Sequence, residues 1–135
     1  MTSAHYAAFE QLLPSGVTVH RGSAQGKLTA DRYPYVVLGG DAGVEGTEAA
    51  SGDPDSLDLR FKLTYAALSF DQVLILIGDV RDALRGRRLV VPGWACNLFR
   101  HEPLVDIRTD FDVTVPDLDI HPVYAVDEFS VFSAR

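Results

Sequence analysis

The sequence has little of what marks secreted or membrane-spanning proteins. It contains a single cysteine, Cys96, so no disulfide can form within the chain. The longest apolar run, VLILI at residues 73–77, is far shorter than the ~20 residues that span a bilayer. Residues 1–16 have neither the basic region nor the long apolar region of a signal peptide. We therefore expect a protein that folds in the cytoplasm of the cell that makes it.

Motifs for metal binding and nucleophilic catalysis are also missing. The four histidines fall on separate expected elements and form no HExxH motif: His5, His20, His101 and His121. No GxSxG motif occurs, and the adjacent carboxylates of Asp127 and Glu128 point to opposite faces of an expected strand. The spacing of Cys96 and His101 separates these two side chains in the same way. The sequence therefore predicts no catalytic residue, no metal site and no cofactor.

Basic residues are scarce relative to acidic ones. The chain has 19 Asp and Glu against 12 Lys and Arg, a formal net charge of −7, so its average surface repels nucleic acids and anionic membranes. The hydrophobic fraction of 47% and the charged fraction of 23% are ordinary for a folded globular protein. A length of 135 residues predicts a single domain over residues 1–135.

Alternation of apolar and polar residues is the clearest pattern that is present. It is strongest at 57–65, where one face is expected to join the core and the other to carry charge. The acidic segment 105–120 has no clear assignment. The strand-like stretches, in chain order, are 17–20, 33–40, 57–65, 88–93, 94–102 and 121–134.

Two further stretches have helical periodicity. An apolar stripe predicts a helix over 3–13. A second helix is expected to begin after Ser69, which forms a capping box with Gln72, and to end at Gly86. The order α-β-β-β-α-β-β predicts a small α+β domain, in which a mixed or antiparallel sheet of about four to five strands packs against two helices.

Residues 39–55, GGDAGVEGTEAASGDPD, combine five glycines with five carboxylates. The stretch lacks the lysine of a P-loop and precedes a strand instead of a helix, so we do not expect it to bind phosphate. Its carboxylates lack the spacing of an EF-hand. Two interpretations remain, a solvated turn or a mobile acidic Gly-rich loop that a neighbouring protein surface orders.

Opposite charges on two segments suggest a contact between protein surfaces. The first segment lies in the glycine-rich stretch and carries Asp41, Glu45 and Glu48. The second lies at the end of the second helix and carries Arg81, Arg85, Arg87 and Arg88. These arginines also complement the helix dipole, which is the alternative reason for their position. We predict these seven residues as candidates for a subunit or assembly interface.

Five stretches occur together in one order along the chain: LLPSGVTVHRG (12–22), YPYVVLGGDAG (33–43), LDLRFKLTYAALSFDQV (57–73), LVVPGWACNLFRHE (89–102) and VYAVDEFSV (123–131). In these stretches the chain resembles the tail terminator (tail completion) proteins of long-tailed phages that infect actinobacteria. The resemblance implies a small α+β subunit that forms a six-membered ring on the finished tail tube, stops its polymerisation and meets the head-completion proteins. It implies no enzymatic activity and no cofactor.

The same resemblance implies partners and a location. The expected partners are other copies of the chain, the tail tube protein and a head-completion or connector protein, while DNA passes through the ring without specific recognition and no membrane is bound. The protein would be part of the virion at the head-tail joint, with the 39–55 segment at subunit or tube contacts. Two alternatives remain: a head-tail connector or stopper, and a small host ligand-binding domain with a pocket around Trp94, Cys96 and His101.

Overall fold

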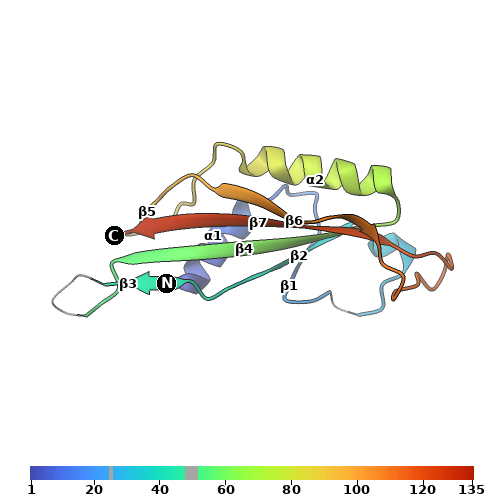
Figure 1. Cartoon of the computed structure of the whole chain (residues 1–135), viewed down its shortest axis with the longest axis horizontal. Coiled ribbons are helices and arrows are strands. Elements are labelled where there is room, and N and C mark those ends of the chain that lie inside the picture. The colour runs from blue at the N-terminus through green and yellow to red at the C-terminus, as the bar shows by residue number, and fades with distance from the viewer. Residues whose placement is uncertain (25, 48–51) are drawn as a thin grey trace.

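Two helices pack on one face of a single β-sheet. Figure 1 shows the arrangement in a computed structural model, which describes residues 1–24, 26–47 and 52–135. The elements are α1 Thr2–Leu12, β1 Val19–Arg21, the 3-10 helix η1 Ala30–Arg32, β2 Tyr35–Gly40, β3 Val44–Gly46, β4 Ser56–Ala67, α2 Phe70–Leu84, β5 Ala95–Cys96, β6 Arg100–Thr109 and β7 Val123–Ala134. The expected α+β class is confirmed. The described residues form seven strands, more than expected, and the additional ones are the short β3 and β5.

Strands β4 and β7 form the centre of the sheet. They pair antiparallel along their whole length. Strands β2 and β3 pair with β4 on one side, and β1 pairs with β2 in parallel. On the other side β5 and β6 both pair with β7. The two longest strands, which are more than 50 residues apart in the sequence, therefore hold the other five together.

The core lies between this sheet and the helices. The five apolar residues of the 57–65 alternation are all completely buried, while Asp58, Arg60 and Lys62 are exposed on the other face, as expected. Phe9 of α1 stacks on Phe61 of β4, with ring centroids 4.1 Å apart. Because burying one such aromatic side chain contributes roughly 1.5–3 kcal/mol, this contact anchors α1 to the centre of the sheet.

Helix α2 begins with the expected capping box. The Ser69 hydroxyl accepts a hydrogen bond from the backbone N–H of Gln72 at 3.2 Å. The Gln72 side chain reaches back to the N–H of Leu68 at 2.7 Å, one residue before the cap. After the helix, Gly86 adopts the left-handed conformation with φ of 69°, which favours glycine and ends the helix.

Residues 39–55 are not one continuous loop. Gly40 ends β2, residues 44–46 form β3, and both strands pair with β4. A Cβ on Gly40 would collide with the backbone carbonyl of Arg60 and with the Tyr6 hydroxyl, and the φ of 141° at Gly40 favours glycine as well. This glycine allows close approach to β4 and α1. The expected mobility of the segment stays a prediction, and Glu48 lies outside the described residues.

Strand β6 is the outer strand beside β7, and its pairing is irregular. The register shifts between Pro103 and Val105 and again between Val105 and Arg108. Proline also has no N–H to donate to a neighbouring strand. Residues 105–109, the first five of the unassigned segment 105–120, are thus part of a strand, because pairing with β7 extends a stretch whose composition gives no clear periodicity. The expected strand at 88–93 is wrong, because this segment makes no sheet pairing in the structure.

The close approach at Gly40 predicts a position-specific effect of an added methyl group. We expect Gly40→Ala to lower the free energy of unfolding by roughly 2–3 kcal/mol, because the methyl group meets backbone that cannot move independently of β4. The matched control is Gly39→Ala in the same strand, where a Cβ meets nothing within 4 Å. Denaturant unfolding of both variants measures the difference. Equal stability of the two variants would contradict this account of Gly40.

Candidate functional site

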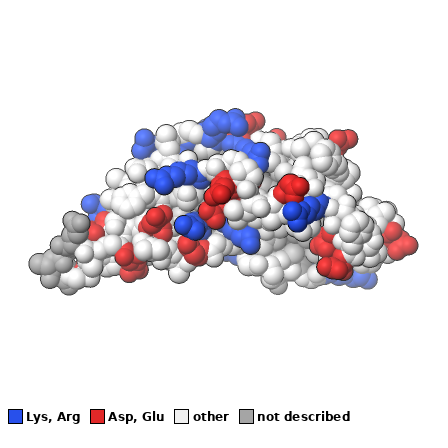
Figure 2. All heavy atoms as spheres, in the orientation of Figure 1, with Lys and Arg blue, Asp and Glu red and all other residues white. Residues whose placement is uncertain are grey.

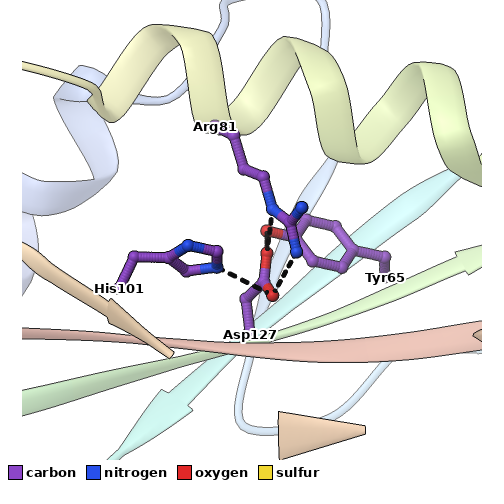
Figure 3. Close-up of polar contacts among 4 residues, drawn as sticks. All are labelled: Tyr65, Arg81, His101 and Asp127. Atoms are coloured by element: carbon purple, nitrogen blue, oxygen red, sulfur yellow. Dashed lines mark hydrogen bonds and ion pairs between the residues drawn. The ribbon is translucent and has the colours of Figure 1, made fainter. Parts of the chain in front are cut away.

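A buried carboxylate collects three hydrogen-bond donors between α2 and the sheet (Figure 3). Asp127 of β7 is 2% exposed. Arg81 of α2 donates to both of its oxygens, from Nε at 2.9 Å and from Nη2 at 2.8 Å. The Tyr65 hydroxyl of β4 donates at 2.8 Å, and Nε2 of His101 on β6 lies at 3.0 Å. One carboxylate thus joins three strands and a helix.

The environment of Asp127 favours its charged form. Burial alone would raise the pKa of this carboxyl, but the donors around it outweigh burial and lower the pKa below its ordinary value. Burial and the charge of Asp127 raise the pKa of the Tyr65 hydroxyl, so Tyr65 stays a donor. The hydrogen bonds to Asp127 likewise raise the pKa of Arg81. The cluster is therefore a satisfied ionic network inside the core.

The chemistry available at this cluster is limited. The hollow beside it measures about 160 Å³ and is lined by Arg81, Leu84, Arg85, Gly86, Phe99, His101 and Phe129. None of these carries a hydroxyl or thiol that His101 could activate as a nucleophile. His101 is also held by stacking on Phe129, with centroids 4.8 Å apart. The Asp127 cluster is better suited to holding α2 and β6 against β4 and β7 than to catalysing a reaction.

The sequence alone does not predict this network, although the position of Asp127 in its strand indicates part of it. Period two along β7 places Asp127 on the same face as Phe129 and Val131, which are buried. A carboxylate in a core-facing register needs a partner. The identity of the partners depends on how α2 and β6 lie against β7, which no local pattern specifies.

The predicted arginine cluster is divided by the fold. Arg81 turns inward to Asp127, so it does not belong to an exposed patch. Arg85 pairs with Asp82 at 2.7 Å on the exposed side of the helix. Arg88 donates to the backbone carbonyl of Cys96 at 3.2 Å. Arg87 is exposed. Three of the four arginines therefore remain at the surface at the end of α2.

The predicted acidic residues are divided as well. Asp41 has a structural role, because its carboxylate accepts hydrogen bonds from the backbone N–H groups of Gly43 at 3.1 Å and Arg60 at 3.0 Å. The backbone carbonyl of Asp41 also accepts from the Tyr6 hydroxyl at 2.7 Å. Glu45 is exposed on β3. In the described residues, the acidic and basic candidates are thus not brought together within one copy.

The face of the sheet away from the helices carries both signs of charge. A shallow hollow of about 370 Å³ lies over the centre of this face. Its lining residues include both acidic and basic side chains: Asp58, Arg60, Arg100, His101, Glu102, Glu128 and Ser130. Figure 2 shows acidic and basic atoms interspersed over the visible side of the molecule. Such a face suits contact with another polar protein surface and does not form a continuous basic track for nucleic acid.

A cavity of about 300 Å³ lies at the other end of that face, partly under the 110–122 segment. The Tyr33 hydroxyl in its wall is buried without a hydrogen bond of ordinary geometry among the described residues. Burial raises the pKa of this hydroxyl, and the nearby Tyr35 hydroxyl lowers it in part. The pocket suggested by the sequence is divided. Trp94 and Cys96 belong to one group, because His5 contacts the Trp94 ring and its Nε2 lies 3.0 Å from the Ser133 hydroxyl, which also contacts Cys96. His101 belongs to the Asp127 cluster instead.

Within residues 1–24, 26–47 and 52–135, no three His, Cys, Asp or Glu side chains are grouped so that they could hold a metal ion. No helix in this part of the chain is long and apolar enough to cross a membrane.

The chain is similar in fold to a known structure. No protein-family model and no curated protein matches the chain. Among solved structures, it is similar to a chain from the "Virion of native gene transfer agent (GTA) particle", with a TM-score of 0.52 and 20% sequence identity. The two chains share a fold. The similarity covers 98% of this chain and 94% of the other, so it includes the whole domain and not a common fragment.

The Asp127 network predicts a pH-dependent loss of stability. We expect Asp127→Asn to lower the free energy of unfolding by roughly 2 kcal/mol near neutral pH, below the value for a fully buried pair because the Arg81 side chain is 35% exposed. Since the pKa of Asp127 is lowered by folding, its contribution is complete above the ordinary Asp pKa of about 3.9 and is lost as the pH falls through the lower folded value.

Urea unfolding of both proteins from pH 5 downwards measures this difference. The matched control is Glu128→Gln, the neighbouring carboxylate on the opposite face, for which we expect a change within about 0.5 kcal/mol. A difference between wild type and Asp127→Asn that stays constant down to pH 2 would show that the charge of Asp127 does not stabilise the fold.

Proposed function

We propose that this protein is a structural component of a phage-type virion that acts as a tail terminator. Copies of the chain form a ring on the completed tail tube, end tail polymerisation and provide the tail side of the head-tail joint. The proposed location is therefore the virion, after assembly in the host cytoplasm. Neither enzymatic activity nor a cofactor is part of this function.

The observation that carries the proposal is the fold shared with a chain of a gene transfer agent virion over nearly the full length of both. Because the similarity runs over nearly the whole length of both chains, the shared domain fits a subunit that repeats in an assembly. The five sequence stretches that resemble tail terminators add the specific role. They include the central β4 and most of β7, and so involve the centre of the fold.

The architecture supports the proposed partners. The mixed charges over the β4 and β7 outer face suit a polar contact with the tail tube or a head-completion protein. The net charge of −7 suits a ring through which DNA passes without being held. A head-tail connector or stopper shares these properties and is the second candidate, because the similar structure is that of a virion as a whole.

Particles assembled without this protein separate the two roles. We expect electron microscopy to show abnormally long tails unattached to heads, because nothing stops polymerisation of the tube. Supplying the wild-type chain in trans is the control and should restore tails of uniform length. Tails of normal length beside DNA-filled, tailless heads would support the connector role and contradict termination.

The alternative that this protein is a host ligand-binding domain predicts a different result. A small molecule that occupies the Tyr33 cavity should raise the Tm of the purified protein, and the protein should remain monomeric at high concentration. Both results together, with normal particles in its absence, would contradict the virion role.

A further inference from the structure

The N-terminal half of α2 presents large apolar side chains to solvent. Phe70, Leu74 and Ile75 are 56%, 45% and 66% exposed. The helix packs on the sheet through a separate buried stripe, so these three side chains are not needed for that contact. Apolar side chains gathered on one exposed surface mark a contact site.

Ile75 also forms part of a groove of about 730 Å³, which we call the α2 groove, between α2 and the segments 14–18 and 31–34. Its apolar lining residues are Pro14, Val17, Tyr33, Pro34, Ile75 and Leu76. Asp31 and Asp79 also line it, and Arg32, which donates to the Lys27 carbonyl, is the single cation in the lining. The α2 groove is therefore apolar inside with a net acidic border.

The other end of α2 has the complementary character. Val90 is 85% exposed and lies in the segment 87–91, which we call the Val90 segment. Its neighbours Leu89 and Val91 are buried, so the backbone is anchored while Val90 projects outward. Arg87 is exposed beside it, and the bond from Arg88 to Cys96 holds the segment in place. This surface is an apolar side chain bordered by cations.

The two surfaces cannot meet within one copy. Helix α2 has 15 residues and is therefore about 22 Å long. The α2 groove lies along residues 72–79 of the helix, and the Val90 segment follows its C-terminal end (Figure 1). Figure 2 shows basic atoms over the C-terminal end of α2, whereas its N-terminal half is mostly uncharged with a few acidic atoms.

We propose that the Val90 segment of one copy occupies the α2 groove of the next copy, an inference that rests on the proposed ring. Val90 contacts Ile75 and the apolar wall, while Arg87 lies near Asp79. Because groove and segment are different surfaces, the contact is heterologous and repeats around a closed ring. One helix then carries both halves of the subunit interface.

Charge argues against two other occupants of the α2 groove. The 110–122 segment also exposes apolar residues, including Phe111 at 75%, but it carries four aspartates and neither Lys nor Arg, so the acidic border of the α2 groove repels it. A groove-to-groove dimer brings like charges together for the same reason. Val90 combines the highest exposure among the exposed apolar side chains with neighbouring cations.

A mixing experiment tests the head-to-tail contact. Ile75→Asp disables the α2 groove, and Val90→Asp disables the Val90 segment. Each exposed substitution should leave the fold intact and weaken self-association of the purified full chain at least about tenfold. A mixture of the two variants should form dimers and nothing larger, because one intact groove and one intact segment remain. Analytical ultracentrifugation and native mass spectrometry measure these species, and Phe111→Asp is the control with wild-type assembly.

Charge reversal tests the orientation. Asp79→Arg and Arg87→Asp should each weaken assembly, and the double variant should recover at least part of it. The proposal is overturned by rings that persist in Ile75→Asp or Val90→Asp, by a mixture without dimers, or by wild-type protein that associates neither in solution nor on tail tubes. If rings form as described but particles without the protein have normal tails, the ring contact stands and the tail role fails.

Discussion

The antiparallel pairing of β4 with β7 runs from Ser56 opposite Ala134 to Ala67 opposite Val123, and the other elements are attached to this pair. One face of the pair receives both helices, through Phe61 under α1 and Asp127 under α2. The other face is charged over its middle, and at one end Tyr33, Tyr35, Ala66 and Val115 form a second, smaller apolar cluster. Because strand pairing fixes which side chains share a face, it determines both the core and the charged surface at once.

Much of the fold follows from local patterns. The alternation at 57–65 identifies β4 and its buried face, and the capping box at Ser69 locates the start of α2 to within one residue. These features depend on neighbours a few residues away. The short strands β3 and β5 and the extended part of β6 do not, because they become strands only by lying against β4 or β7.

The candidate site is harder to obtain from sequence. Charge alone groups Arg81 with Arg87, yet the fold turns the first inward to the buried Asp127 and leaves the second fully at the surface. Composition alone makes the 39–55 stretch a flexible loop, yet Gly40 is required by a close approach to β4. In each case the residue type is informative, but the direction of its side chain depends on partners more than fifteen residues away.

The irregular outer strand β6 has a consequence for crowded assembly. Wherever many copies of a chain meet, an open sheet margin invites strand-by-strand growth into aggregates. Proline at position 103 and two breaks in register deprive this margin of a regular row of donors and acceptors. Strand β6 is therefore a poor template for pairing with a strand of another copy. Contacts between copies then depend on side chains, whose geometry allows a finite, closed assembly.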